Sequence, residues 1–146
     1  MTLSNNHVVI IALSDILKKG VEMRIFKTPL FAKWAKREKL LDSQLCQAVK
    51  EIGQGLIDAD LGGHIYKKRI ALQGQGKRGG ARSILAYQVK ESAFFIFGFT
   101  KNEKATISEE DLKIAKVFAR EVLKYSHAQL DKLVKDGKLC EVQYER

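Results

Sequence analysis

The stretch GGHIYKKRIALQGQGKRGGARSILAYQVKESAFFIFGFTK, residues 62–101, decides the fold class because it contains three consecutive strand patterns. Residues 62–72 and 81–89 alternate between two sets of side chains with a period of two, as strands do. Residues 93–101 are almost wholly apolar, which is expected for a strand that is covered on both faces. The glycine-rich segment 73–80 joins the first two runs as a long hairpin loop. These residues predict a three-strand antiparallel meander.

Helical patterns precede the meander. Residues 23–28 alternate like a short strand. A helix is then expected over 28–40, where Thr28 is the cap and Pro29 occupies the first helical position. Residues 41–58 repeat the helical spacing of apolar side chains. We expect these two helices to form a hairpin that packs on the sheet.

Two further helices and a last strand are expected after the meander. Ser108 is an N-cap with Asp111 at the capping-box position, and residues 126–137 have the pattern of a short helix that ends at a glycine. Residues 138–144 are a candidate for the last strand. The order of strand, helical hairpin, three-strand meander and C-terminal helices predicts an α+β fold with a small antiparallel sheet.

The chain divides into a leading segment and one domain. Its 146 residues suit a single domain with a hydrophobic core. A chain that began at Met23 would make equal sense, so we expect residues 1–22 to be an N-terminal extension of unknown role and residues 23–146 to be the domain. No segment approaches the roughly 20 apolar residues of a membrane span. The apolar run at 7–13 lacks the flanking sequence of a secretory signal.

The net charge of +9 is confined to the middle of the chain. Residues 1–22 and 108–146 each sum to zero, whereas residues 23–107 carry all nine net charges. Between Asp60 and Glu91 there is no acidic residue, while seven lysines and arginines occur there. Basicity that is local in this way indicates an anionic partner.

The segment KKRIALQGQGKRGGARSI, residues 67–84, holds six of these cations and four glycines. Its G-x-G-x-x-G pattern leads into a strand rather than a helix, which disfavours nucleotide binding. A solvated basic turn without function is one alternative. Against it, Lys67 and Arg69 share a strand face that Arg82 can also join, and like charges there cost about 0.2–1 kcal/mol per opposed pair. A polyanion whose phosphates neutralise the cations explains the crowding.

The sequence indicates neither a metal site nor a nucleophilic triad. His7, His64 and His127 are scattered, and no acid-rich cluster accompanies them. Cys46 and Cys140 match no ligand spacing and are expected to be reduced thiols of a cytoplasmic protein. Metal-free RNA cleavage needs groups that position the strand, move two protons and stabilise charge on the phosphate. Arginine stays charged for the last task, and lysine can act as a base where neighbouring cations favour its neutral form.

Two segments carry a resemblance to a known family. YKKRIALQGQGKRGGARSILAYQV at 66–89 and FFIFGFTKNEKATISEEDLKIAK at 94–116 resemble the RelE/HigB-type toxins of bacterial toxin–antitoxin pairs. The likeness runs from about Met23 to the end of the chain. It implies a small antiparallel sheet with helices on one face, and cleavage of messenger RNA, usually on the translating ribosome, without a metal or other cofactor. It also implies a cognate antitoxin, which is expected to be a small and often DNA-binding protein.

The resemblance also implies site residues. The family's catalytic basic pair falls on Lys67 and Arg69, with Lys67 as candidate base and Arg69 as a phosphate clamp. Its phosphate-binding arginine falls on Arg82, and a further clamp or proton donor falls on Lys101. A tyrosine that some members carry near the last helix is absent from residues 102–113. Additional contacts to RNA phosphates are expected from three other cations of the basic segment, Lys68, Lys77 and Arg78.

Two other functions remain open from the sequence. A ParE-like toxin of the same fold would poison DNA gyrase through a protein interface instead of cleaving RNA. A non-catalytic RNA-binding or ribosome-binding module would bind with a steep dependence on salt and leave RNA intact. The basic cluster favours the endoribonuclease.

Overall fold

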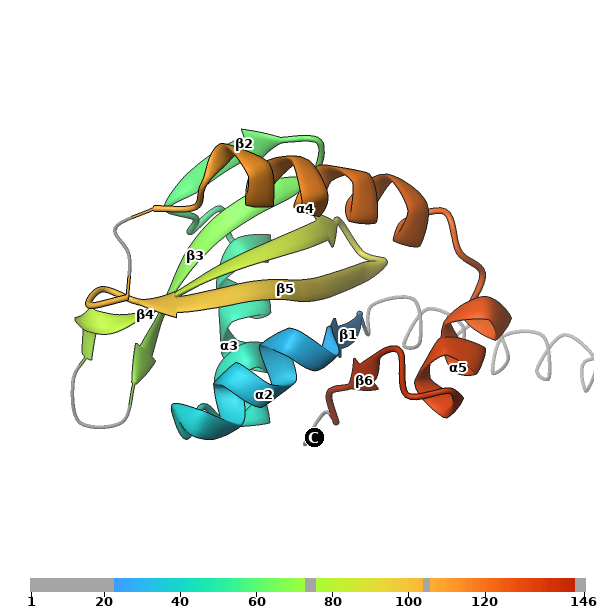
Figure 1. Ribbon diagram of the computed structural model, residues 1–146, viewed down its shortest axis with the longest axis horizontal. Helices are drawn as coiled ribbons and strands as arrows, with labels where there is room; N and C mark the ends of the chain where they lie inside the picture. Colours follow the sequence, from blue (N-terminus) through green and yellow to red (C-terminus); the bar gives the residue numbers. More distant parts are fainter. Residues whose placement is uncertain (1–22, 73–75, 104–105, 144–146) are drawn as a thin grey trace, which may run out of the picture.

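The computed structural model describes residues 23–72, 76–103 and 106–143, and the side chains of 76–79 are not part of this description. The expected N-terminal extension, 1–22, lies outside the described residues. The element order is β1 (Arg24–Lys27), α2 (Pro29–Arg37), α3 (Asp42–Gly53), β2 (Ala59–Gly62), β3 (Ile65–Leu72), β4 (Gly76–Gln88), β5 (Ser92–Thr100), α4 (Glu109–Val122), α5 (His127–Lys135) and β6 (Cys140–Glu141) (Figure 1). The predicted α+β fold, with its strand, helical hairpin, meander and C-terminal helices, is confirmed.

The strands form one six-stranded sheet in the order β2-β3-β4-β5-β1-β6. Strands β3, β4 and β5 pair antiparallel, as the meander predicted. The sheet departs from the predicted antiparallel pattern at one place, because β1 runs parallel to β5. The α2–α3 hairpin leads from β1, which lies beside β5, to β2 at the far edge of the sheet. Strand β6 pairs antiparallel with β1 and forms the other edge.

Two boundaries in the meander differ from the sequence prediction. Strand β4 begins at Gly76, which pairs with Leu72, so most of the predicted loop 73–80 belongs to the strand. The predicted strand 62–72 begins at Ile65 instead, because the chain turns before it through left-handed backbone at Gly62, Gly63 and His64. Glycine adopts this conformation without steric cost.

The sheet has a hydrophobic core on each face. Helices α2 and α3 cover one face, where they pack against Phe95 of β5. Helices α4 and α5 cover the other face, where they pack against Phe94 of β5. Figure 1 shows α3 and α4 on opposite sides of the meander. The prediction that β5 is covered on both faces is therefore confirmed, whereas the arrangement implied by the resemblance, with helices on one face, is not what the structure has.

Side-chain caps fix where the helices begin. Thr28 accepts a hydrogen bond from the backbone N–H of Phe31 at 3.1 Å, and Ser108 accepts one from Asp111 at 3.1 Å, so both predicted caps are confirmed. The Thr28 hydroxyl also donates to the carbonyl oxygen of Ile96 at 2.9 Å. This second bond fastens the start of α2 to the part of β5 that lies beyond its pairing with β1.

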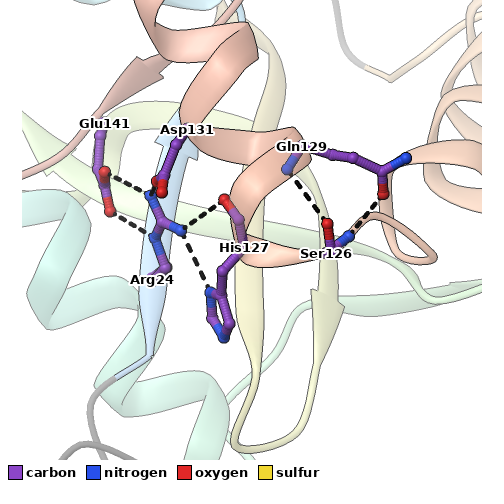
Figure 2. Close-up of polar contacts among 6 residues, drawn as sticks. All are labelled: Arg24, Ser126, His127, Gln129, Asp131 and Glu141. Atoms are coloured by element: carbon purple, nitrogen blue, oxygen red, sulfur yellow. Dashed lines mark hydrogen bonds and ion pairs between the residues drawn. The ribbon is translucent and has the colours of Figure 1, made fainter.

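Arg24 ties the C-terminal elements to the sheet (Figure 2). Its Nε and Nη2 atoms donate to the two carboxylate oxygens of Glu141 at 2.9 and 2.8 Å, and Nη2 also donates to Asp131 at 2.6 Å. Its Nη1 lies 3.2 Å from Nδ1 of His127, which must accept because a guanidinium only donates. The hydrogen bonds to Glu141 raise the pKa of Arg24. One arginine thus joins β1, α5 and β6.

Gly98 of β5 lies against the Trp34 ring of α2, and this close approach gives a first prediction. An alanine Cβ there would lie 2.3 Å from Cε3 of Trp34. Gly98→Ala is expected to lower the free energy of unfolding by about 1–3 kcal/mol, because the packed ring must move. Denaturant unfolding followed by fluorescence of the single tryptophan measures this effect.

Gly53→Ala is the matched control for Gly98→Ala. At Gly53 the nearest atom to an added Cβ is the Tyr87 hydroxyl oxygen at 3.5 Å, an ordinary contact, so the free energy of unfolding should change by less than about 1 kcal/mol. Equal stability of the two variants would show that Trp34 is not held against β5.

Candidate nucleic-acid interface

The strand register brings three of the predicted site residues to one side of the sheet. Arg69 of β3 and Arg82 of β4 are direct Cα partners, and Lys67 pairs with Ile84, two residues further along β4. Directly opposed residues of antiparallel strands point to the same face, with Cβ atoms about 4.5–5.5 Å apart, and diagonal neighbours are about 7–8 Å apart. We call Lys67, Arg69 and Arg82 the basic face; it lies on the α4 side of the sheet, to which Ile84 also belongs.

The three residues of the basic face differ in exposure. Arg69 is exposed and Lys67 is half-buried, whereas Arg82 is only 8% exposed. Nη1 of Arg82 donates to the carbonyl oxygen of Gly80 at 3.4 Å. Within the described part of the chain Lys67 makes no side-chain hydrogen bond or ion pair. Lys67 and Arg69 are therefore the members of this set that a ligand reaches most directly.

Asp58, which the sequence reasoning did not single out, orients Arg69. Its Oδ2 accepts from the backbone N–H of Arg69 at 2.6 Å, and its Oδ1 lies 3.4 Å from the Arg69 Nε. Asp58 comes directly before β2, whose first residue Ala59 pairs with Lys67, so it occupies the edge of β3 next to that pairing. The sequence feature that could have indicated this role is the position of Asp58 directly before β2, which pairs antiparallel with β3.

The structure places the predicted RNA contact Lys68 on the other side of β3 from the basic face. By the alternation of a strand its side chain lies opposite Lys67 and Arg69, and it is 4% exposed. Its Nζ pairs with Glu51 of α3 at 2.8 Å and donates to the carbonyl oxygen of Leu56 at 2.8 Å. This buried contact removes Lys68 from the surface that RNA could touch, and it also removes one cation from the crowding predicted around Lys67. The sequence feature that could have indicated this pair is the helical spacing of Glu51. It lies three residues after the buried Ala48, and residues three apart lie on the same side of a helix.

The remaining predicted residues lie at the same end of the meander as Arg82. Thr100 pairs with Ala81, and Lys101 follows it as an exposed residue of the next turn. Lys77 and Arg78 belong to the β4 backbone, but their side chains are outside the description that the structure gives. Lys101 is thus at the rim of the basic face rather than within it.

A groove of about 550 Å³ opens beside the basic face, between α2 and the end of β5. We call it the α2–β5 groove. Its lining includes apolar, cationic and acidic side chains from α2, β5 and the segment before α4, namely Leu30, Lys33, Trp34, Arg37, Phe97, Phe99, Glu103, Ile107 and Asp111. A larger cavity of about 790 Å³ lies elsewhere, around α3 and Met23, and contains no residue of the basic face.

Glu103 holds the end of the α2–β5 groove together. Its Oε1 accepts from Nε1 of Trp34 at 3.1 Å and from the backbone N–H of Thr100 at 2.9 Å, and its Oε2 lies 3.2 Å from Nη2 of Arg37. These bonds, first of all the one from Trp34, lower the pKa of Glu103. The carboxylate is therefore fixed in its charged form at the mouth of the groove.

The lowered pKa of Glu103 predicts how stability depends on pH. Its contribution to folding is fully present above the ordinary pKa of 4.5 and is lost as the pH falls through the lower folded-state value. Because the side chain is solvent-exposed, we expect less than about 1 kcal/mol. Wild type should be more stable than Glu103→Gln at pH 6.5 by urea unfolding, and the difference should shrink as the pH falls below 4.5. A difference that did not shrink would contradict the charge as its cause.

Within residues 23–72, 76–103 and 106–143, no three His, Cys, Asp or Glu side chains gather as a metal site requires. None of the helices described in these ranges has both the length and the apolarity needed to cross a membrane.

The fold and the site define a small α+β protein with three cations on the α4 side of its sheet. A family model described as "RelE toxin of RelE / RelB toxin-antitoxin system" matches residues 23–142. The chain belongs to this RelE toxin family, so it is a toxin of a toxin–antitoxin system and a cognate antitoxin is its implied partner. No curated protein matches the chain.

Proposed function

We propose that this toxin is a metal-free endoribonuclease that cleaves messenger RNA on the ribosome and thereby inhibits translation. The observation that carries the proposal is the register of β3 and β4, in which Arg69 and Arg82 are direct partners and Lys67 is their neighbour on the same face. Three cations on one sheet face suit the phosphate backbone of a nucleic acid. Membership of the RelE toxin family is consistent with this activity.

The proposed reaction uses the 2′-hydroxyl of the RNA as the nucleophile. Its oxygen attacks the adjacent phosphorus, the bond from phosphorus to the 5′-oxygen breaks, and the products are a 2′,3′-cyclic phosphate and a 5′-hydroxyl. Lys67 takes the proton of the 2′-hydroxyl, and Lys101 returns one to the leaving oxygen. Arg69 and Arg82 hold the phosphate oxygens and stabilise the extra negative charge.

Arg69 must exchange its acidic partner for a phosphate in this scheme. The contact between Arg69 Nε and Asp58 Oδ1 is 3.4 Å long and exposed, so it stabilises the protein by at most about 1 kcal/mol. Asp58 keeps its bond from the Arg69 backbone N–H after the side chain has moved. A phosphate, which offers several acceptor oxygens, can therefore compete for the guanidinium.

Further parts of the proposal concern partners and location. Lys77 and Arg78 are proposed to hold phosphates that flank the cleaved one, and Lys68 is left out because its amine is buried against Glu51. The antitoxin is proposed to be a small DNA-binding protein, and the site of action to be the cytoplasm.

Mapping transcript 5′ ends after a short pulse of expression tests the proposal. New 5′-hydroxyl ends inside coding regions, absent when Lys67→Met is expressed, are the expected result. A DNA-damage response without new RNA ends would support a ParE-like gyrase poison instead. Growth arrest with neither signal, together with salt-dependent ribosome binding, would support a non-catalytic binding module.

A further inference from the structure

We infer that the α2–β5 groove binds a nucleobase of the RNA strand, next to the phosphate held by the basic face. This inference rests on the proposed function, since it assigns a base-binding subsite to the same substrate. The comparisons with known proteins assign no role to the groove.

The sheet register connects the groove to the basic face. Phe99 pairs with Arg82, which pairs with Arg69, and these three residues form one row across β5, β4 and β3. Phe97 pairs with Ile84, which pairs with Lys67, and forms the next row. Neighbouring strands are about 4.8 Å apart, so the β5 residues lie roughly 10 Å from those on β3. A strand of a few nucleotides that crosses the basic face reaches the groove.

The chemistry of the walls fits a base rather than a phosphate. Leu30, Phe97 and Ile107 supply apolar surface, of which Leu30 is 62% exposed and Phe97 is partly exposed. Aromatic side chains stack on any base, because every base has a π-face. Glu103 and Asp111 place carboxylates in the lining, and like charge disfavours a phosphate there.

Cations surround this apolar lining. Lys33 and Arg37 come from the exposed side of α2, and the exposed Lys101 lies in the chain between the groove residues Phe99 and Glu103. They can attract the phosphates on either side of a bound base. A groove with aromatic and aliphatic walls and cations at its rim is complementary to one nucleotide of a single strand.

The groove carries its own spectroscopic probe. Trp34, the only tryptophan of the chain, lines it, with its ring against Gly98 and its Nε1 bonded to Glu103. A base that enters the groove changes the surroundings of this ring. The fluorescence of Trp34 in the full-length toxin should therefore respond to RNA and saturate with the binding curve.

The test uses a short 2′-O-methyl oligoribonucleotide, which lacks the attacking hydroxyl and stays intact. Phe97→Leu, which keeps apolar volume and removes the ring, is expected to raise its Kd about tenfold. Phe97→Tyr should restore binding. Tyr125→Leu, at an exposed aromatic residue beyond the end of α4, is the matched control and should leave the Kd unchanged. Removing the base at one position of the oligonucleotide should weaken binding to wild type about tenfold and to Phe97→Leu hardly at all.

The outcomes separate this inference from the proposed function. If RNA is cleaved and bound through Lys67 and Arg69, but Trp34 does not respond and Phe97→Leu binds as wild type, the base subsite is wrong and the proposed function stands. If RNA neither binds nor is cleaved, both fall. If Trp34 responds to the antitoxin and not to RNA, the groove belongs to the protein partner and the inference is overturned.

Discussion

Replacing Lys67 by methionine is expected to reduce the rate of RNA cleavage at least a hundredfold. General acid–base catalysis by one positioned side chain contributes about 10²–10⁴ in rate, and Lys67 is the proposed base. Its side chain has no hydrogen-bond or ion-pair partner in the described part of the chain, so the variant should fold like wild type. The rate is measured on a labelled RNA with ribosomes present and absent, and stability by thermal unfolding.

Lys135→Met is the control for Lys67→Met. Lys135 is an exposed lysine at the end of α5, so its loss removes the same charge. Helix α5 precedes β6, which lies at the opposite edge of the sheet from β2 and β3. It should leave the cleavage rate within about twofold of wild type. Equal activity of Lys67→Met and Lys135→Met would mean that Lys67 is not the base.

Variants of the two arginines also test whether the basic face is the active site. Arg69→Met should lower the rate by about 10²–10³, the usual loss when one group that stabilises a developing anion is removed. Arg82 is buried, so its replacement also affects folding and must be read together with an unfolding measurement. In cells, Lys67→Ala combined with Arg82→Ala should relieve growth arrest while folded protein accumulates. If the folded double variant stayed fully toxic, the basic face would not be the active site.

Local rules explain which parts of the fold could be predicted. The meander followed from a period of two, and the starts of α2 and α4 followed from Thr28 and Ser108, because strand alternation and caps depend on residues near in sequence. The parallel pairing of β1 with β5 depends on how the α2–α3 hairpin crosses the sheet. The covering of both faces depends on packing between distant segments, for which the sequence offered only the apolar run of β5.

The same distinction applies to the site. That Lys67 and Arg69 share a face follows from alternation, and Arg82 joined them because β3 and β4 are neighbours in a hairpin. The partners of the cations were not predictable in this way. Glu51 meets Lys68 only once α3 has docked on β3, and the α2–β5 groove exists only because Gly98 lets Trp34 lie against the sheet.

Glu51→Gln is expected to lower the free energy of unfolding by about 3–5 kcal/mol, the usual cost of removing one partner of a buried ion pair. Only 5% of the Lys68 side chain and 14% of the Glu51 side chain are exposed, so the stranded ammonium would have little access to water. The carbonyl oxygen of Leu56 would still accept from Lys68 but would not neutralise it. Urea unfolding of the full chain measures the loss.

An exposed ion pair and a double variant decide whether burial is the cause. Arg37→Met breaks the contact with Glu103, in which 63% of the arginine side chain is exposed, and should cost at most about 1 kcal/mol. Adding Lys68→Met to Glu51→Gln should recover part of the stability, because no unpaired charge then remains inside. The pair also has a consequence for function. A one-residue slip of β3 would move Lys67 and Arg69 from the α4 side of the sheet to the side covered by α2 and α3, and the fixed position of Lys68 opposes that slip. If Glu51→Gln and Arg37→Met were equally stable, the buried pair could not be what holds the basic face on the α4 side of the sheet.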